Sequence, residues 1–263
     1  MKIILSGIYG TKPLEFTYRP FKLIELFRIA KELSLDGVDY IATIPDLFST
    51  PKIPLALSKE YGVPIIGIHA PMHLLFYTPS FFFNRLINMI SFFPDCKVFN
   101  FHLSGFVNHL QKNGRNLKQF SYLAKEHGVT LSIESNPLLA GLQYYPKVTY
   151  DPETFAEYCI ANNLPITFDT THVAHCNYDI VAFFRKYNKH IKLIHLSDSI
   201  GSIQHLSLGK GNLPVKELLK EIRKSSFNQF LEFEICNFPN GTTVKEKTEE
   251  IRKSFNMVKQ YAM

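Results

Sequence analysis

The chain has 263 residues, 46% of them hydrophobic, and a formal net charge of +6 at pH 7. This length and apolar content can bury a large core, and the mild basic excess suits an anionic ligand but is also ordinary. The four cysteines form no Cys-x-x-Cys pair, which argues against a disulfide framework and a thiolate zinc site. No apolar stretch is long enough to span a bilayer and none is signal-like, so we expect a cytoplasmic protein.

Short apolar runs alternate with segments of helical periodicity along the whole chain. The predicted strand–helix pairs are, in chain order, Ile3–Ile8 with Phe21–Leu33, Gly37–Ala42 with Pro51–Tyr61, Val63–His69 with Ser80–Phe92, Lys97–His102 with Gly114–His127, Val129–Glu134 with Pro152–Asn162, Leu164–Asp169 with Tyr178–Tyr187, Ile191–His195 with Pro214–Lys224, and Gln229–Glu234 with a helix from about Thr243 to Tyr261.

Eight alternations predict a parallel sheet that closes into a single (β/α)8 TIM barrel, with residues 1–263 forming one domain. An open doubly wound sheet is the alternative. Such a sheet would more often begin with a glycine-rich first turn, and residues 7–10 (Gly-Ile-Tyr-Gly) are a poor version of one.

The predicted strand ends carry side chains that bind divalent cations. They are His69, His102, Glu134, Asp169 followed by His172, His195 and Glu234, with His205 in the loop after the seventh strand. Each one alone could be a solvated loop residue, and Asp169 could simply cap a helix. In a barrel, however, strand ends converge on one cavity, so together they predict a site for zinc, manganese or magnesium.

Three further residues are placed near this site by sequence. Glu232 should face the barrel interior one layer below Glu234 and would need a partner there. Asp198 could orient an imidazole or cap its loop, and we count it with Lys210, between Gly209 and Gly211, as a candidate for binding substrate. The histidines without a strand-end position are interpreted as surface or structural; these are His73, His109, His127, His175 and His190.

Taken together, these motifs resemble the xylose isomerase-like TIM-barrel superfamily, which includes sugar and sugar-phosphate isomerases and epimerases and the endonuclease IV branch. The resemblance covers nearly the whole chain. It rests on Ile68–Pro71, Phe101–Gly105, Ile133–Asn136, Phe168–His172, Ile194–Asp198, His205–Gly211 and Glu234.

The isomerase branch implies one divalent ion held by residues matching Glu134, Asp169, His195 and Glu234. Glu134 and Glu234 would also serve as acid and base on opposite faces of a bound sugar. Because a cation polarises the carbonyl, the proton on the adjacent carbon can be removed to give an enediolate. The resemblance therefore implies a small sugar or sugar phosphate as substrate.

The endonuclease IV branch implies a zinc cluster that cleaves abasic-site DNA, with His69, His102, His172 and His205 as additional ligands. This chain departs from that pattern at Ile203, where the branch has an aspartate, and in residues 135–141 after the strand-five glutamate. The loops Tyr77–Phe83 and Leu139–Tyr145 are more aromatic than basic. A barrel that binds a metal or ligand without turnover is the third alternative, and the oligomeric state is left open.

Overall fold

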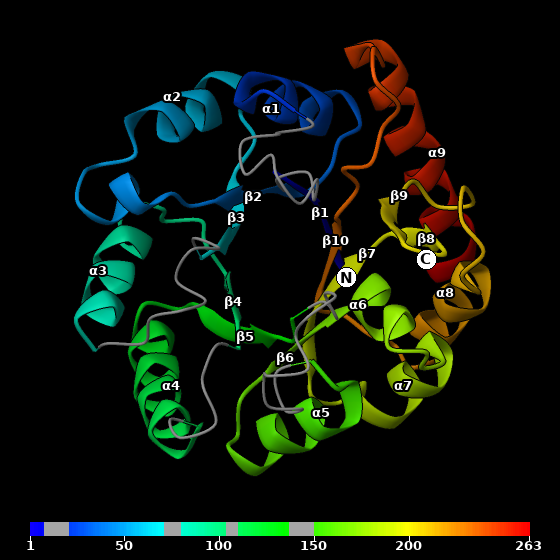
Figure 1. The fold of residues 1–263 in the computed structure, drawn as a ribbon. Coiled ribbons are helices and arrows are strands. Elements are labelled where there is room, and N and C mark those ends of the chain that lie inside the picture. Colours follow the sequence, from blue (N-terminus) through cyan, green and yellow to red (C-terminus); the bar gives the residue numbers. More distant parts are fainter. Residues whose placement is uncertain (8–20, 71–79, 104–109, 137–149) are drawn as a thin grey trace.

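The computed structural model describes residues 1–7, 21–70, 80–103, 110–136 and 150–263. Eight parallel strands close into a barrel in the order β1-β10-β7-β6-β5-β4-β3-β2 (Figure 1). Their bounds are β1 Lys2–Ser6, β2 Gly37–Ile41, β3 Ile65–His69, β4 Val98–His102, β5 Thr130–Glu134, β6 Ile166–Asp169, β7 Ile191–Leu196 and β10 Phe230–Phe233. All eight strands match predicted ones. The barrel is confirmed and the open sheet is wrong, because β1 pairs with both β2 and β10.

The helices surround the barrel (Figure 1). They are α1 Leu23–Glu32, α2 Lys52–Tyr61, α3 Ser80–Ile90, α4 Leu110–Glu126, α5 Pro152–Ala161, α6 Thr170–His175, α7 Ile180–Tyr187, α8 Val215–Lys224 and α9 Val244–Ala262, with a 3-10 helix η1 at Ile44–Leu47. In α8, for example, the buried residues Val215, Leu218, Leu219 and Ile222 form one apolar stripe against the barrel. None of the described helices is long and apolar enough to cross a membrane.

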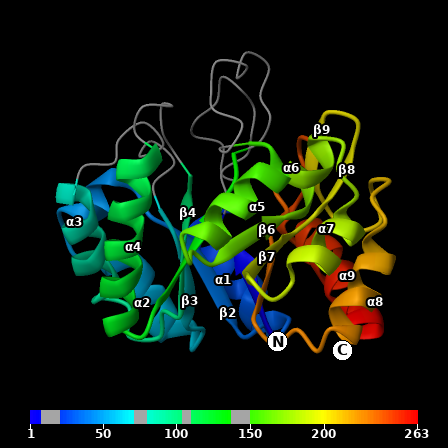
Figure 2. The same cartoon turned by 90° about the horizontal axis from the view of Figure 1, so that it is seen from below.

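Three short elements were not predicted: η1, α6 and an antiparallel hairpin of β8 (Asp198–Ile200) and β9 (Ile203–Leu206). Each is too short to show a periodicity that distinguishes it from a loop. Figure 2 shows α6 and the hairpin at one end of the barrel and both termini at the other. Helix α4 also begins four residues before the predicted Gly114.

The barrel interior changes from apolar to polar along its axis. Ile4, Ile66, Val98 and Leu193 form a separate apolar cluster, against which Phe230 packs. Alternate residues of a strand share a face. Nearer the strand ends, inward positions are polar and buried, among them Asp39, Asn100, Ser132, Thr167 and Glu232. The strand ends thus lie on a polar layer above an apolar floor.

Gly67 of β3 makes room for one of these polar side chains. A Cβ atom at Gly67 would lie 2.4 Å from Oδ1 of Asp39, closer than atoms can approach. We therefore expect Gly67→Ala to lower the free energy of unfolding by about 1–3 kcal/mol, as overpacking does. Urea unfolding measures the effect. In an Asp39→Ala background, Gly67→Ala should lower the free energy of unfolding by a smaller amount. An equal decrease in both backgrounds would contradict the steric explanation.

Candidate metal centre

Four of the predicted ligands meet at one end of the barrel. Glu134 ends β5, Asp169 ends β6, His195 lies in β7 and Glu234 follows β10. One potential ligand atom from each lies within 4.8 Å of the other three. His195 Nδ1 faces the three carboxylates, at 3.1 Å from Glu234 Oε2, 3.3 Å from Glu134 Oε1 and 4.0 Å from Asp169 Oδ2. The strand order therefore brings together residues that are up to 100 positions apart in the sequence.

The same four residues have buried polar atoms that are left without partners. Glu134 Oε1, Asp169 Oδ2, His195 Nδ1 and Glu234 Oε2 have no hydrogen bond of normal geometry within the described residues. Buried polar atoms are nearly always satisfied, so four orphans that face one another need an explanation. A divalent cation among them would satisfy all four, and three carboxylates with one imidazole suit zinc, manganese or magnesium.

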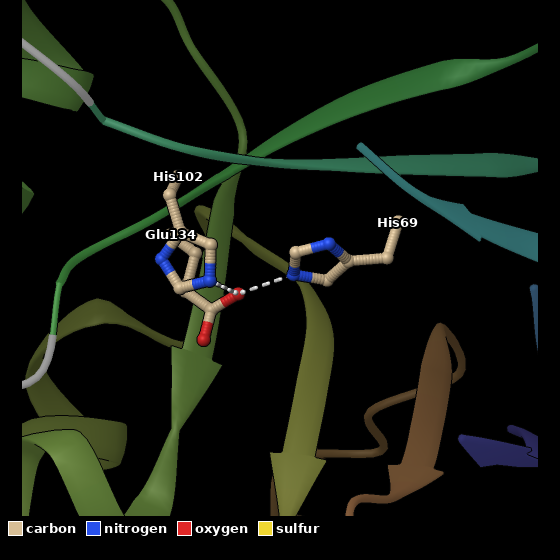
Figure 3. Close-up of side chains that lie close together, drawn as sticks. All are labelled: His69, His102 and Glu134. Atoms are coloured by element: carbon tan, nitrogen blue, oxygen red, sulfur yellow. Dashed lines mark ion pairs between the residues drawn. The ribbon is translucent and has the colours of Figure 1, made fainter. Parts of the chain in front are cut away.

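Two further groups adjoin the first. His69 and His102 point at the Glu134 carboxylate (Figure 3), with their Nε2 atoms 3.6 and 3.4 Å from Oε2. On the other side, Asp169, His172 and His205 form a third group that could hold an ion. Glu134 is shared by two groups and Asp169 by two. All eight predicted metal ligands therefore lie together in the structure.

Asp169 caps a helix and still presents one carboxylate oxygen to the candidate metal centre. Its Oδ1 caps helix α6 by accepting hydrogen bonds from the backbone N–H groups of Thr171 (2.6 Å) and His172 (2.8 Å). Its Oδ2 remains free and faces the centre. Capping therefore fixes the orientation of the carboxylate and leaves one oxygen for a cation.

Sequence analysis missed Asn100 and Asp39. The Asn100 amide donates a hydrogen bond to Glu134 Oε2, and Asn100 Oδ1 accepts one from the Thr167 hydroxyl at 2.7 Å. These contacts hold Glu134 in place from below. The available signal was the two-residue period, because Asn100 stands two positions before His102 and so shares its face. Asp39 gave no such signal, because its strand, β2, ends in Ile41 and not in a residue that binds cations.

Burial and neighbouring charges shift the pKa values here in opposite directions. Burial alone would raise the pKa of Glu134, but the adjacent His102 and His195 hold it well below its ordinary value. Burial lowers the pKa of His102 to about 3. In the layer below, burial raises the pKa of Asp39 to about 6, whereas burial and the nearby Asp39 raise that of Glu232 to about 8. Burial likewise raises the pKa of Glu234, so Glu134 differs from Glu234 and from the two carboxyl groups below in the direction of its shift.

The two predicted substrate-binding residues have other partners in the structure. Asp198 is buried and accepts hydrogen bonds from four backbone N–H groups, those of Ser199, Gly209, Gly211 and Leu213, at 2.8–3.1 Å. Of its two predicted roles, these bonds match loop capping. Lys210 is exposed and lies 3.8 Å from Glu250 of α9. A contact of either residue with substrate stays a prediction.

The remaining histidines are less informative. His127 and His190 are exposed and His175 is partly buried. His73, His109, residues 77–79 and residues 139–145 lie outside the described residues, whereas residues 80–83 belong to α3.

Comparison with known proteins agrees with this architecture. The xylose isomerase-like TIM-barrel family model matches residues 27–261. None of the curated proteins compared with the chain matches it. Among solved structures, a D-tagatose 3-epimerase-like protein superposes with a TM-score of 0.67 at 21% identity, covering 100% of both chains.

Two other solved structures are similar over nearly their full length. D-psicose 3-epimerase of Clostridium cellulolyticum H10, with D-tagatose, gives a TM-score of 0.76 at 13% identity, covering 100% of this chain and 99% of that one. A sugar phosphate isomerase/epimerase of Parabacteroides distasonis gives 0.71 at 15%, covering 100% and 96%. At these identities the likeness shows the shared fold.

The four backbone hydrogen bonds to Asp198 predict that even a conservative substitution there will lower the stability of the fold strongly. In Asp198→Asn the amide nitrogen would face backbone donors, so at least one buried N–H loses its acceptor, and stability should fall by about 2 kcal/mol or more. Asp36→Asn is the control, because Asp36 accepts a hydrogen bond from one backbone N–H group of the described residues, that of Ile3. Urea unfolding of both variants measures the difference. Equal losses would show that the network contributes no more than a single bond.

Proposed function

Because this chain belongs to the xylose isomerase-like TIM-barrel family, we propose that it is a divalent-metal-dependent isomerase or epimerase of a sugar or sugar phosphate. The observation that carries the proposal is the set of four orphaned, mutually facing atoms of Glu134, Asp169, His195 and Glu234. The sugar epimerases among the solved structures share the fold and support the same proposed function.

A divalent ion, when bound, would polarise the carbonyl of the sugar and make the proton on the adjacent carbon more acidic. The four residues would hold it: Glu134, Asp169, His195 and Glu234. Their ligand set contains no cysteine, which suits zinc, manganese or magnesium.

Glu134 and Glu234 are the proposed acid and base. They come from β5 and the end of β10, so they approach the centre from different parts of the barrel wall. One carboxylate would take the proton from the carbon next to the carbonyl, giving an enediolate. The other carboxyl group would return a proton to the opposite face of the same carbon, or to its neighbour. Return to the opposite face is epimerisation, and return to the neighbour is isomerisation.

A zinc phosphodiesterase acting on abasic-site DNA is the second candidate. It is favoured by the three adjoining ligand groups, because a cluster of ions could occupy them together. Ile203 opposes it. This residue begins β9 and is 48% exposed, and its apolar side chain cannot bind a cation.

The two oxygens of Asp169 allow metal binding to be separated from folding. Asparagine caps helices well, so Asp169→Asn should keep α6 and the thermal unfolding temperature. It replaces the free oxygen with an amide nitrogen that cannot bind a cation. Metal affinity, measured by chelator competition, should then fall by more than the about 10–100-fold that follows loss of an outer partner.

Asp179→Asn is the matched control, because Asp179 caps α7 in the same way through the N–H groups of Val181 and Ala182. It should leave metal affinity unchanged. An Asp169→Asn protein with wild-type metal content would contradict the assignment of this ligand.

The proposed reaction is tested by loading the protein with manganese, magnesium or zinc and incubating it with ketoses and their phosphates in deuterium oxide. Deuterium should appear at a carbon adjacent to the carbonyl, and Glu134→Gln should abolish this exchange while the fold stays intact. Two or three zinc ions per chain together with cleavage of abasic-site DNA would favour the phosphodiesterase and overturn the isomerase proposal.

A further inference from the structure

Glu232 is a fully buried carboxyl group that the proposed chemistry does not use. It lies on β10 two residues before Glu234 and therefore one layer deeper in the barrel. The register of β10 with β7 places it directly beside His195. Its Oε2 lies 3.6 Å from His195 Nε2.

The two ring nitrogens of His195 therefore face carboxyl groups in two different layers of the barrel interior. Nδ1 faces the carboxylates of the candidate metal centre, and Nε2 faces Glu232. A neutral imidazole has one protonated and one unprotonated nitrogen, and only the unprotonated one can bind a cation. For Nδ1 to serve as a ligand, the proton must reside on Nε2 and needs an acceptor there.

We propose that Glu232 is the positioning residue that accepts the Nε2–H of His195 and so holds Nδ1 toward the metal centre. This inference rests on the metal-dependent function proposed above. The role needs an acceptor oxygen rather than a negative charge, because ionised and protonated carboxyl groups both retain an acceptor. The sequence suggested only that this residue would need a partner, and His195 is that partner.

A purely structural role explains Glu232 poorly. Neither of its carboxylate oxygens has a hydrogen bond of normal geometry within the part of the chain that the structure describes, although the Ser6 hydroxyl lies near enough to lower its pKa. It stands directly above the apolar cluster that includes Leu193 and Phe230. A buried, poorly satisfied carboxyl group destabilises a fold, and an apolar side chain of similar size is often neutral or stabilising in its place.

Two substitutions at this position separate the roles. Glu232→Leu removes the acceptor and should weaken metal affinity by about 10–100-fold, as loss of an outer hydrogen-bond partner does. The same variant should unfold, without metal, at a temperature no lower than that of the wild type. Glu232→Gln keeps an acceptor oxygen and should retain affinity close to that of the wild type. Affinity is measured with Co²⁺ by visible absorption and with Zn²⁺ by chelator competition.

Asp179→Asn again serves as the control, because Asp179 caps α7 through the N–H groups of Val181 and Ala182. It should leave metal affinity nearly unchanged. The inference is overturned if Glu232→Leu binds metal as tightly as the wild type, or if Glu232→Gln loses as much affinity as Glu232→Leu. A wild-type protein that binds neither ion would instead overturn the proposed function.

Discussion

The structure depends on the burial of one carboxylate among imidazoles. Glu134 is fully buried, and ring nitrogens of His69, His102, His172 and His195 lie 3.3–3.6 Å from its two oxygens. A lone buried carboxylate would be costly, so it requires polar groups around it. The strand order supplies them, because β3, β4, β6 and β7 end around β5.

The layer beneath explains how such a centre can be rigid. Asn100 and Thr167 form a hydrogen-bonded chain that ends on Glu134, and Thr167 also bonds Ser132 at 2.7 Å. All of these residues come from strands whose positions are fixed by the backbone ladder. The side chains that would touch a cation are thus oriented by polar groups that do not touch it. This arrangement is how proteins commonly tune a metal site.

The strands and the clustering of the candidate ligands could be predicted from the sequence because both carry strong local signals. In Val129–Glu134, apolar residues alternate with small hydroxyl residues until the run ends in an acid, and barrel topology then determines where that acid must lie. The same reasoning failed where the signal is tertiary. Asp39 lies in a strand with an apolar end, and the two-residue period shows only that Asn100 shares a face with His102; what each side chain contacts is known only once the neighbouring strands are in place. Helix α6 was missed because six residues show no helical period, although the cap at Asp169 was recognised as an option.

The hydrogen bonds to Asp198 have a consequence for how this barrel could diversify. A Cβ atom at Gly211 would lie 2.3 Å from both Asp198 Oδ1 and the Ser199 carbonyl oxygen, and Gly209 adopts a φ of +83°. Neither position therefore accepts another residue without rebuilding the loop, whereas the side chain of Lys210 between them is exposed. Within residues 209–211, only the side chain of Lys210 can therefore change without rebuilding the loop.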